Sequence, residues 1–167
     1  MALVTTGKAR FLYLNAWEPR KAEGSNKAQY SVCLVIPKSD TATYDAIQAA
    51  YVDVFNETVD TTLKGVKFDK LNFPLRDGDT EREGDENFAG CWFLNATSIY
   101  PPLIGDKDKN VITDHSQLYS GCYGRAAVSF FAYNRQGNKG IGCGLRKLLK
   151  LEDGEKIGGN GINFDEF

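Results

Sequence analysis

The sequence lacks the features that mark membrane, secreted and disulfide-bonded proteins. No apolar run approaches the roughly 20 residues that span a bilayer, and the opening MALVTTGKARF holds no apolar signal stretch. The four cysteines, Cys33, Cys91, Cys122 and Cys143, form no Cys-x-x-Cys pair. Buried free thiols are therefore expected, with a zinc site assembled from all four as the alternative. These absences predict a cytosolic protein.

Signals for catalysis are also scarce. The single histidine, His115, lies in the turn-like stretch TDHSQ, and no serine sits in a GxSxG elbow. The run GNKGIGCG lacks the GK[ST] ending of a phosphate loop. The acidic stretches 77–88 and 106–117 lack the glycine and the final glutamate of a calcium loop. We therefore predict no enzyme, metal or cofactor, with a metal-dependent nuclease using these carboxylates as one alternative.

Charge is segregated along the chain, although the net charge is only -2. Residues 115–150 contain six basic residues and no carboxylate, whereas residues 77–86 hold six carboxylates around one arginine. Residues 151–167 hold five carboxylates and one lysine. The distribution of charge says more about partners than its sum does, so the basic stretch is a candidate surface for an anionic ligand.

The stretch YSGCYGRAAVSFFAYN, residues 119–134, combines rings, an arginine and small residues. If it is a strand, side chains alternate between two faces, and Gly121 and Gly124 mark a bend or bulge. One face is small and apolar, which suits a packed interior. The other face is large, flat and partly cationic, and is made by Tyr119, Gly121, Tyr123, Arg125, Ala127, Ser129, Phe131 and Tyr133. That face is either a second hydrophobic core or an open platform on which flat ligands stack.

The rest of the chain reads as short strands with one helix. Apolar residues at helical spacing predict a helix capped by Ser39 or Asp40 and ending near Glu57. The segment 74–90 is expected to be a long loop, and Leu103-Ile104 is expected to form a hairpin with Val111-Ile112. Strands are expected over residues 5–17, 29–36, 65–72, 91–98, 119–134 and 141–151. One helix among six or seven strands favours a mostly all-β fold, an OB-type Greek-key barrel with an inserted helix, with a β-sandwich as the alternative.

Two segments are expected, a folded domain over residues 1–155 and a flexible Gly-rich acidic tail over residues 156–167. The tail ends in NFDEF, so Asp165, Glu166 and Phe167 form a small anionic and aromatic epitope. Such an epitope can occupy a basic groove or a pocket of a partner protein. The alternative is an end that only promotes solubility.

Several stretches resemble a family of bacteriophage single-stranded DNA-binding proteins, once catalogued as a domain of unknown function. They are PLRDGD, WFLNATS, PPLIGDKDKNVITD, LYSGCYGRAAVSFFAYN and GNKGIGCGLRKLLKLEDGE. The similarity covers nearly the whole chain and is most specific over residues 118–151. The resemblance implies an OB barrel, sequence-tolerant binding of single strands in phage replication and recombination, and no catalysis. It also implies the cytoplasm of the infected bacterial host and a tail that recruits replication proteins.

The candidate DNA-binding residues follow from the residues themselves, not from the resemblance. The expected stacking residues are Tyr119, Tyr123, Phe131 and Tyr133. The expected phosphate contacts are Arg125, Arg135, Lys139, Arg146 and Lys147. Further candidates on neighbouring strands are Lys8, Arg10, Tyr13, Trp17 and Trp92. Single-stranded DNA is the expected partner, with replication proteins at the tail, a homo-oligomer as an option and no membrane. The alternative function is a β-sandwich protein-interaction module, such as a virion or host-factor adaptor.

Overall fold

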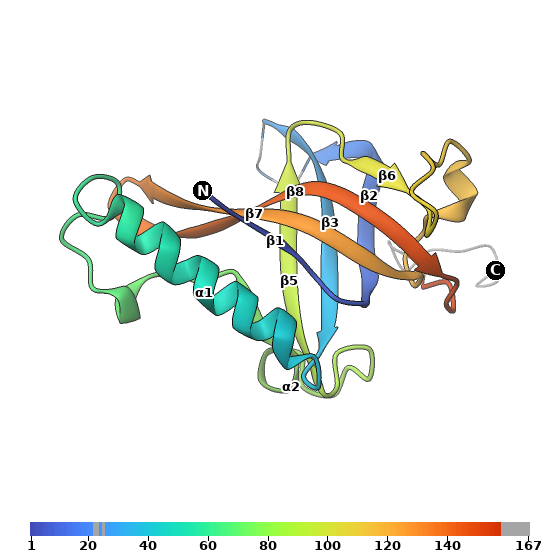
Figure 1. Cartoon of the computed structure of the whole chain (residues 1–167), viewed down its shortest axis with the longest axis horizontal. Coiled ribbons are helices and arrows are strands. Elements are labelled where there is room, and N and C mark those ends of the chain that lie inside the picture. Colours follow the sequence, from blue (N-terminus) through green and yellow to red (C-terminus); the bar gives the residue numbers. More distant parts are fainter. Residues whose placement is uncertain (22–23, 25, 158–167) are drawn as a thin grey trace.

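The computed structural model describes residues 1–21, 24 and 26–157 (Figure 1). The strands are β1 (Ala2–Thr5), β2 (Ala9–Lys21), β3 (Ala28–Pro37), β4 (Leu75–Asp77), β5 (Cys91–Ser98), β6 (Leu103–Gly105), β7 (Tyr123–Arg135) and β8 (Asn138–Glu152). The helices are α1 (Thr41–Thr58) and the single-turn α2 (Gly78–Glu81), with 3₁₀ turns at Phe68–Lys70 and His115–Gln117.

Five of the strands close into a barrel. β7 pairs with β2, β2 with β3, β3 with β5, β5 with β8, and β8 returns to β7. Only the β5–β8 junction in this ring is parallel. β1 extends β7, β6 extends β8 and β4 extends β5. This closed ring confirms the predicted barrel, and a β-sandwich is not what the chain forms.

The long β7–β8 hairpin bends where the sequence places glycine. A Cβ atom on Gly124 would lie 2.1 Å from the carbonyl oxygen of Leu149, so only glycine lets β8 approach there. The register shifts beside Gly124, as predicted, and again after Ala127. β7 begins at Tyr123 and not at residue 119, because Gly121 has a φ of 112°, which breaks an extended strand.

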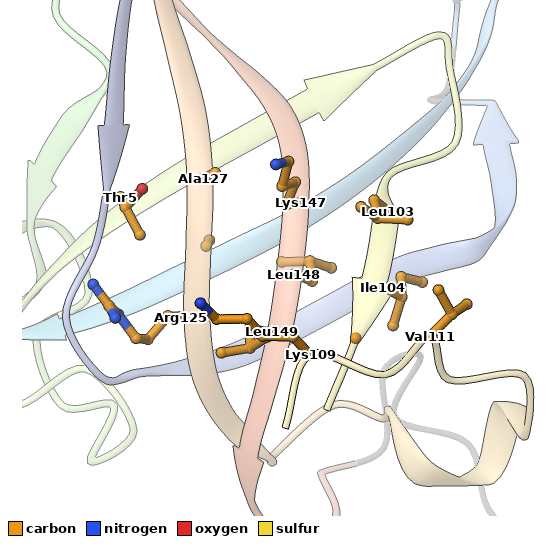
Figure 2. Close-up of a pocket in the computed structure, with 12 residues that line it drawn as sticks. Thr5, Leu103, Ile104, Lys109, Val111, Arg125, Ala127, Lys147, Leu148 and Leu149 are labelled. Atoms are coloured by element: carbon orange, nitrogen blue, oxygen red, sulfur yellow. The ribbon is translucent and has the colours of Figure 1, made fainter. Parts of the chain in front are cut away.

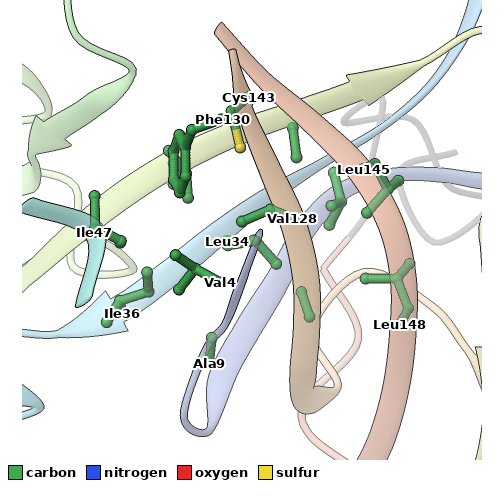
Figure 3. Packing of buried hydrophobic residues seen from close by; sticks show 14 of the residues in the cluster. Val4, Ala9, Leu34, Ile36, Ile47, Val128, Phe130, Cys143, Leu145 and Leu148 are labelled. Atoms are coloured by element: carbon green, nitrogen blue, oxygen red, sulfur yellow. The ribbon is translucent and has the colours of Figure 1, made fainter. Parts of the chain in front are cut away.

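Helix α1 covers one end of the barrel (Figure 1). Its N-cap is Asp40, whose Oδ1 accepts a hydrogen bond of 3.1 Å from the backbone N–H of Thr43. Ile47 and Tyr51 of the buried helix face pack into the core, where the Tyr51 ring meets Phe130 edge-on at 5.4 Å. Figure 3 shows Phe130 of β7 among side chains of α1, β3 and β8. The even-numbered side chains at the start and middle of β7 therefore lie in the core, as predicted for its small, apolar face.

Local structure departs from the sequence prediction in four places. Residues 65–72 form turns and a 3₁₀ helix instead of a strand, and the expected loop 74–90 contains β4 and α2. Of the strand expected over residues 5–17, Thr5 ends β1, residues 6–8 lie outside the strands, and β2 begins only at Ala9. Leu103–Gly105 pairs with β8 rather than with Val111-Ile112, although a single bridge joins Gly105 to Val111. These segments lack a clear period, so neighbouring strands decide their structure.

The cysteines are free, as predicted, with Cys33, Cys122 and Cys143 buried and Cys91 half-buried. Within residues 1–157, apart from residues 22, 23 and 25, no group of three His, Cys, Asp or Glu side chains could hold a metal ion. Among the described residues, no helix is long and apolar enough to cross a membrane.

A pair of neighbouring phenylalanines tests the orientation of β7. Phe130 is fully buried, so Phe130→Ala should lower the free energy of unfolding by about 3–5 kcal/mol. Phe131 is 39% exposed on the opposite face, so Phe131→Ala should cost about 1 kcal/mol or less. Urea unfolding of both variants measures the difference. Equal losses in the two variants would contradict this orientation.

Candidate nucleic-acid interface

The odd-numbered face of β7 points away from the core. Phe131 and Arg125 are exposed, and Tyr133 is half-buried. Ser129 shares this face but is covered, because the Nε of Arg146 donates a 3.3 Å hydrogen bond to its Oγ. The ring-bearing part of this face is thus an open platform and not a second core.

Every second residue of β8 beneath the rings of β7 is a glycine. The facing pairs are Gly140–Tyr133, Gly142–Phe131 and Gly144–Ser129. A Cβ atom on Gly142 would lie 2.6 Å from two atoms of the Phe131 ring, and one on Gly140 would lie 2.7 Å from the Tyr133 hydroxyl. The two side chains therefore occupy the space that side chains on β8 would otherwise fill. These glycines therefore permit the close approach of the two rings to the backbone of β8.

A shallow cavity of about 270 Å³ opens beside the two rings. Arg135 lies at its edge, with its guanidinium carbon 5.5 Å from the centre of the Tyr133 ring. Arg76 of β4 contributes a second exposed guanidinium, which makes a surface ion pair of 3.1 Å with Glu81. The cavity thus combines flat rings with two cations, the combination that suits the bases and phosphates of a single strand.

Small side chains, most of them polar, continue the open face across five strands. Strand pairing places Asn15, Ser31, Thr97, Gly144 and Ser129 in one row over β2, β3, β5, β8 and β7. Asn15 and Ser31 are joined by a 3.2 Å hydrogen bond from Nδ2 to Oγ. Side chains this small project little from the barrel beside the rings. This leaves room for a single strand of nucleic acid.

The sequence prediction missed several members of this surface, among them Arg76, Asn95 and Thr97. Asn95 and Thr97 alternate with the buried Leu94 and Ala96 in the run CWFLNATS, and that alternation marks an outward polar face. Arg76 carried no such signal, because β4 has only three residues and lies within a stretch that reads as loop.

A second group of predicted residues gathers near the start of β2. The half-buried ring of Tyr123 lies 5.2 Å from the Lys8 ammonium and 5.5 Å from the Arg10 guanidinium. Lys8 also pairs with Glu152. Arg10 donates to the carbonyl oxygens of Gly121 and Glu155 at 3.1 and 3.0 Å, so its guanidinium joins β2 to the segments before β7 and after β8.

Tyr119 lies outside the strand and is bound to the segment that follows β8. Its hydroxyl donates to Asp153 at 2.9 Å, and the ammonium groups of Lys150 and Lys156 each lie 5.3 Å from its ring. Hydrogen bonds from Lys150 and then from Tyr119 hold the pKa of Asp153 below its ordinary value. Desolvation, followed by the bond to Asp153, raises the pKa of Tyr119.

Both tryptophans make contacts with other side chains of the protein. Trp17 stacks on His115 at 4.1 Å and donates to the carbonyl oxygen of Leu118 at 3.0 Å. Trp92 stacks on Tyr44 of α1 at 5.1 Å, with the Lys38 ammonium 4.8 Å from its ring. Trp92 therefore faces the helix and lies away from the cavity beside Phe131.

The remaining predicted residues are dispersed. Tyr13 is 42% exposed, at a φ of 49°, with the Arg82 guanidinium 5.7 Å from its ring. Lys139 donates through Nζ to the carbonyl oxygen of Lys64 at 2.6 Å. Arg125 and Lys147 line a separate groove, shown in Figure 2.

The predicted partner-binding residues Asp165, Glu166 and Phe167 lie outside the described residues. The boundary expected after residue 155 stays a prediction. Ile157 still contacts the domain, because its backbone N–H donates to the carbonyl oxygen of Ser120 at 2.9 Å.

Comparisons with known proteins agree with this architecture. The family model described as Enterobacter phage Enc34, ssDNA-binding protein, matches residues 2–167. Protein p50 of Acyrthosiphon pisum secondary endosymbiont phage 1 is 28% identical over 171 residues, covering 98% of this chain and 91% of that protein. Among solved structures, the single-stranded DNA-binding protein of bacteriophage Enc34 in complex with ssDNA has a TM-score of 0.82 at 19% identity, covering 93% of this chain and 89% of that chain.

The single-stranded DNA-binding protein gp2.5 encoded by bacteriophage T7 has a TM-score of 0.66 at 12% identity, covering 99% of this chain and 97% of that chain. The structural likenesses confirm the fold, and the family model matches nearly every residue. The chain therefore belongs to the family of the Enterobacter phage Enc34 ssDNA-binding protein.

Proposed function

We propose that this protein binds single-stranded DNA, with little sequence preference, across the outer face of its barrel. The observation that carries the proposal is the exposed ring of Phe131 and the half-buried ring of Tyr133, which lie beside exposed guanidinium groups in a member of this family. The similar structure from bacteriophage Enc34 is a complex with ssDNA, which supports single-stranded DNA as the ligand. The role we infer is protection of single strands during phage DNA replication and recombination, in the cytoplasm of the infected host.

Stacking supplies the sequence-tolerant part of the binding. Every base has a flat π-face, so each base stacked on Phe131 or Tyr133 contributes about 1–3 kcal/mol whatever its identity. The glycines beneath the rings matter here because they leave free the space in which the rings lie. A ring already held in place loses less conformational entropy on binding than a freely rotating one.

Phosphate contacts supply the salt-dependent part. Arg135 of β7 and Arg76 of β4 both line the cavity, so a DNA backbone that passes the rings comes near both. Both side chains are exposed, and the ion pair that Arg76 makes with Glu81 among the described residues is a weak surface contact. Four other predicted residues remain candidates for DNA contact. They are Lys139 and Arg146 of β8, and Lys8 and Tyr123 further along the barrel.

The row of small polar side chains beside the rings supports binding of any base sequence and not selection of particular bases. Ser, Thr and Asn side chains each both donate and accept, so they satisfy different base edges without selecting one. We infer no catalytic role, because stacking and charge neutralisation account for the groups gathered at this face. Recruitment of replication proteins by residues 165–167 stays a prediction.

Removal of one ring tests the stacking. Tyr133→Ala should weaken binding of a single-stranded oligonucleotide roughly 5- to 150-fold, the equivalent of about 1–3 kcal/mol. Fluorescence anisotropy titration measures the change, and the urea midpoint checks the fold. Tyr100→Ala is the matched control, because Tyr100 is 72% exposed and lies outside the cavity lining. Equal affinity in both variants would remove Tyr133 from the interface.

Removal of one cation tests the phosphate contacts. Arg135→Gln should reduce the dependence of log affinity on log salt by about 0.7, the value for one phosphate on a single strand. The titration is repeated over a salt series with several oligonucleotide sequences. Lys70→Gln, at an exposed position outside the cavity, should leave the slope unchanged. A loss confined to particular sequences would show base readout at Arg135 and contradict the proposal.

A further inference from the structure

The sheet ends at β1, and one edge of this strand is open. β1 pairs with β7 alone. The backbone N–H of Thr6 donates to the carbonyl oxygen of Ala126 at 2.9 Å, so the alternation of an antiparallel ladder turns the backbone groups of Leu3 and Thr5 to the other side. Within residues 1–21, 24 and 26–157, nothing pairs with these groups. Leu3 and Thr5 therefore form the free edge of β1.

The sequence of β1 does nothing to discourage a further strand. Proteins protect exposed strand edges with proline, charged side chains or bulges. β2 carries Glu18, Pro19 and Arg20 beyond its pairing with β7, whereas β1 reads ALVT and pairs in unbroken register. The side chain of Leu3 is 67% exposed. An edge of this kind is where an extended segment of another chain adds to a sheet.

Helix α1 forms the side wall of a groove along this edge. The groove, about 500 Å³ in volume, lies between the start of β1 and the last turns of α1, and its lining includes Leu3, Asp53 and Glu57. Figure 1 shows α1 beside β1. Ala49 and Ala46, both exposed, precede Asp53 by one and two turns on the same helix face. Side chains this small leave room for an added strand to lie on the helix.

The charge of α1 indicates what occupies the groove. The helix has three carboxylates, Asp45, Asp53 and Glu57, and no lysine or arginine. Glu57 pairs with the N-terminal ammonium at 2.9 Å, and Asp53 makes no ion pair with any residue of the described chain. These carboxylates repel a DNA backbone, the same helix of a second copy, and the acidic residues 163–167. A segment that carries lysine or arginine has the complementary charge.

We propose that the free edge of β1 binds, as an added strand, an extended basic segment of a second protein. The backbone of the segment bonds to Leu3 and Thr5, and its side chains alternate between two faces. Apolar side chains lie beside Leu3. Lysine or arginine side chains on the other face lay their aliphatic stems over Ala46 and Ala49 and reach Asp53 with their charged ends. The groove shares no lining residue with the ring cavity, so the two contacts do not compete.

Three fluorescent peptides, in which valine alternates with lysine, glutamine or glutamate, test the proposal on the full-length protein by anisotropy. The lysine peptide should bind most tightly and the glutamate peptide most weakly. Leu3→Pro removes the open N–H without removing a bond to β7, and should weaken binding of the lysine peptide at least about tenfold. Leu3→Val keeps the N–H and is the matched control, so it should bind like the unchanged protein.

A second pair of variants tests the charge. Asp53→Lys should weaken the lysine peptide about tenfold and strengthen the glutamate peptide. Asp45→Lys is the matched control on the same helix. It lies about 12 Å away along the axis, beyond the Debye length of about 8 Å at 0.15 M salt, so it should change the affinity less than about twofold.

Hydrogen exchange locates the added strand. Excess lysine peptide should slow exchange of the Leu3 and Thr5 amide protons and leave that of Val4, which already bonds to β7, unchanged. The urea midpoint checks that Leu3→Pro is folded, and the Asp53 and Asp45 pair decides the matter if it is not. The proposal is overturned if the lysine peptide does not bind, or if Asp53→Lys binds it as tightly as Asp45→Lys does.

The other possible occupants give different results. Self-association without peptide that Leu3→Pro abolishes would assign the edge to a second copy. A loss of oligonucleotide affinity in folded Leu3→Pro would assign the edge to DNA. Either result overturns the proposal. Failure of the peptide to bind, with oligonucleotide affinity intact, would leave the proposed DNA binding untouched.

Discussion

The pairing that closes the barrel is the constraint on which every functional surface of this protein depends. β7 is bonded to β2 near its start and to β8 along its length, and β8 in turn reaches β5. With β7 held at both sides, its side chains have only two directions available. Phe130 enters the core against Tyr51, and Phe131 is thereby turned outward.

The same hairpin supplies both the rings and the surface beneath them. Because Gly140 and Gly142 face Tyr133 and Phe131, the rings lie over backbone and do not compete with neighbouring side chains. Further along, β8 carries Lys147 and Leu149 at the corresponding outward positions, and β6 joins its edge. One hairpin thus presents an aromatic surface at one end and an apolar, cationic groove at the other, separated by the covered Ser129. The two ends therefore differ in chemistry, one carrying rings and the other aliphatic side chains with cations.

The sequence predicted the architecture, and it placed the candidate site residues on strands without showing which of them lie together. Strong period-two segments such as QYSVCLVI and CWFLNATS, and the helix that begins after Asp40, form the elements expected of them. Alternation also assigned Phe131 and Tyr133 to one face. Alternation did not show that Gly121 has a positive φ, and this φ separates Tyr119 from the strand. Tyr119 instead donates a hydrogen bond to Asp153. Residues such as Arg10 and Trp92 carry the right chemistry for DNA, but tertiary contacts hold them within the fold, and no local pattern reports such contacts.

Photocrosslinking can show whether single-stranded DNA lies over Phe131 and Tyr133. The full-length protein would be irradiated with a thymine-rich single strand, digested, and the modified residues located by mass spectrometry. The account predicts adducts on Phe131 or Tyr133 in the peptide that spans the end of β7. Adducts confined to Trp17, Trp92 or Tyr119, with none on the end of β7, would contradict it.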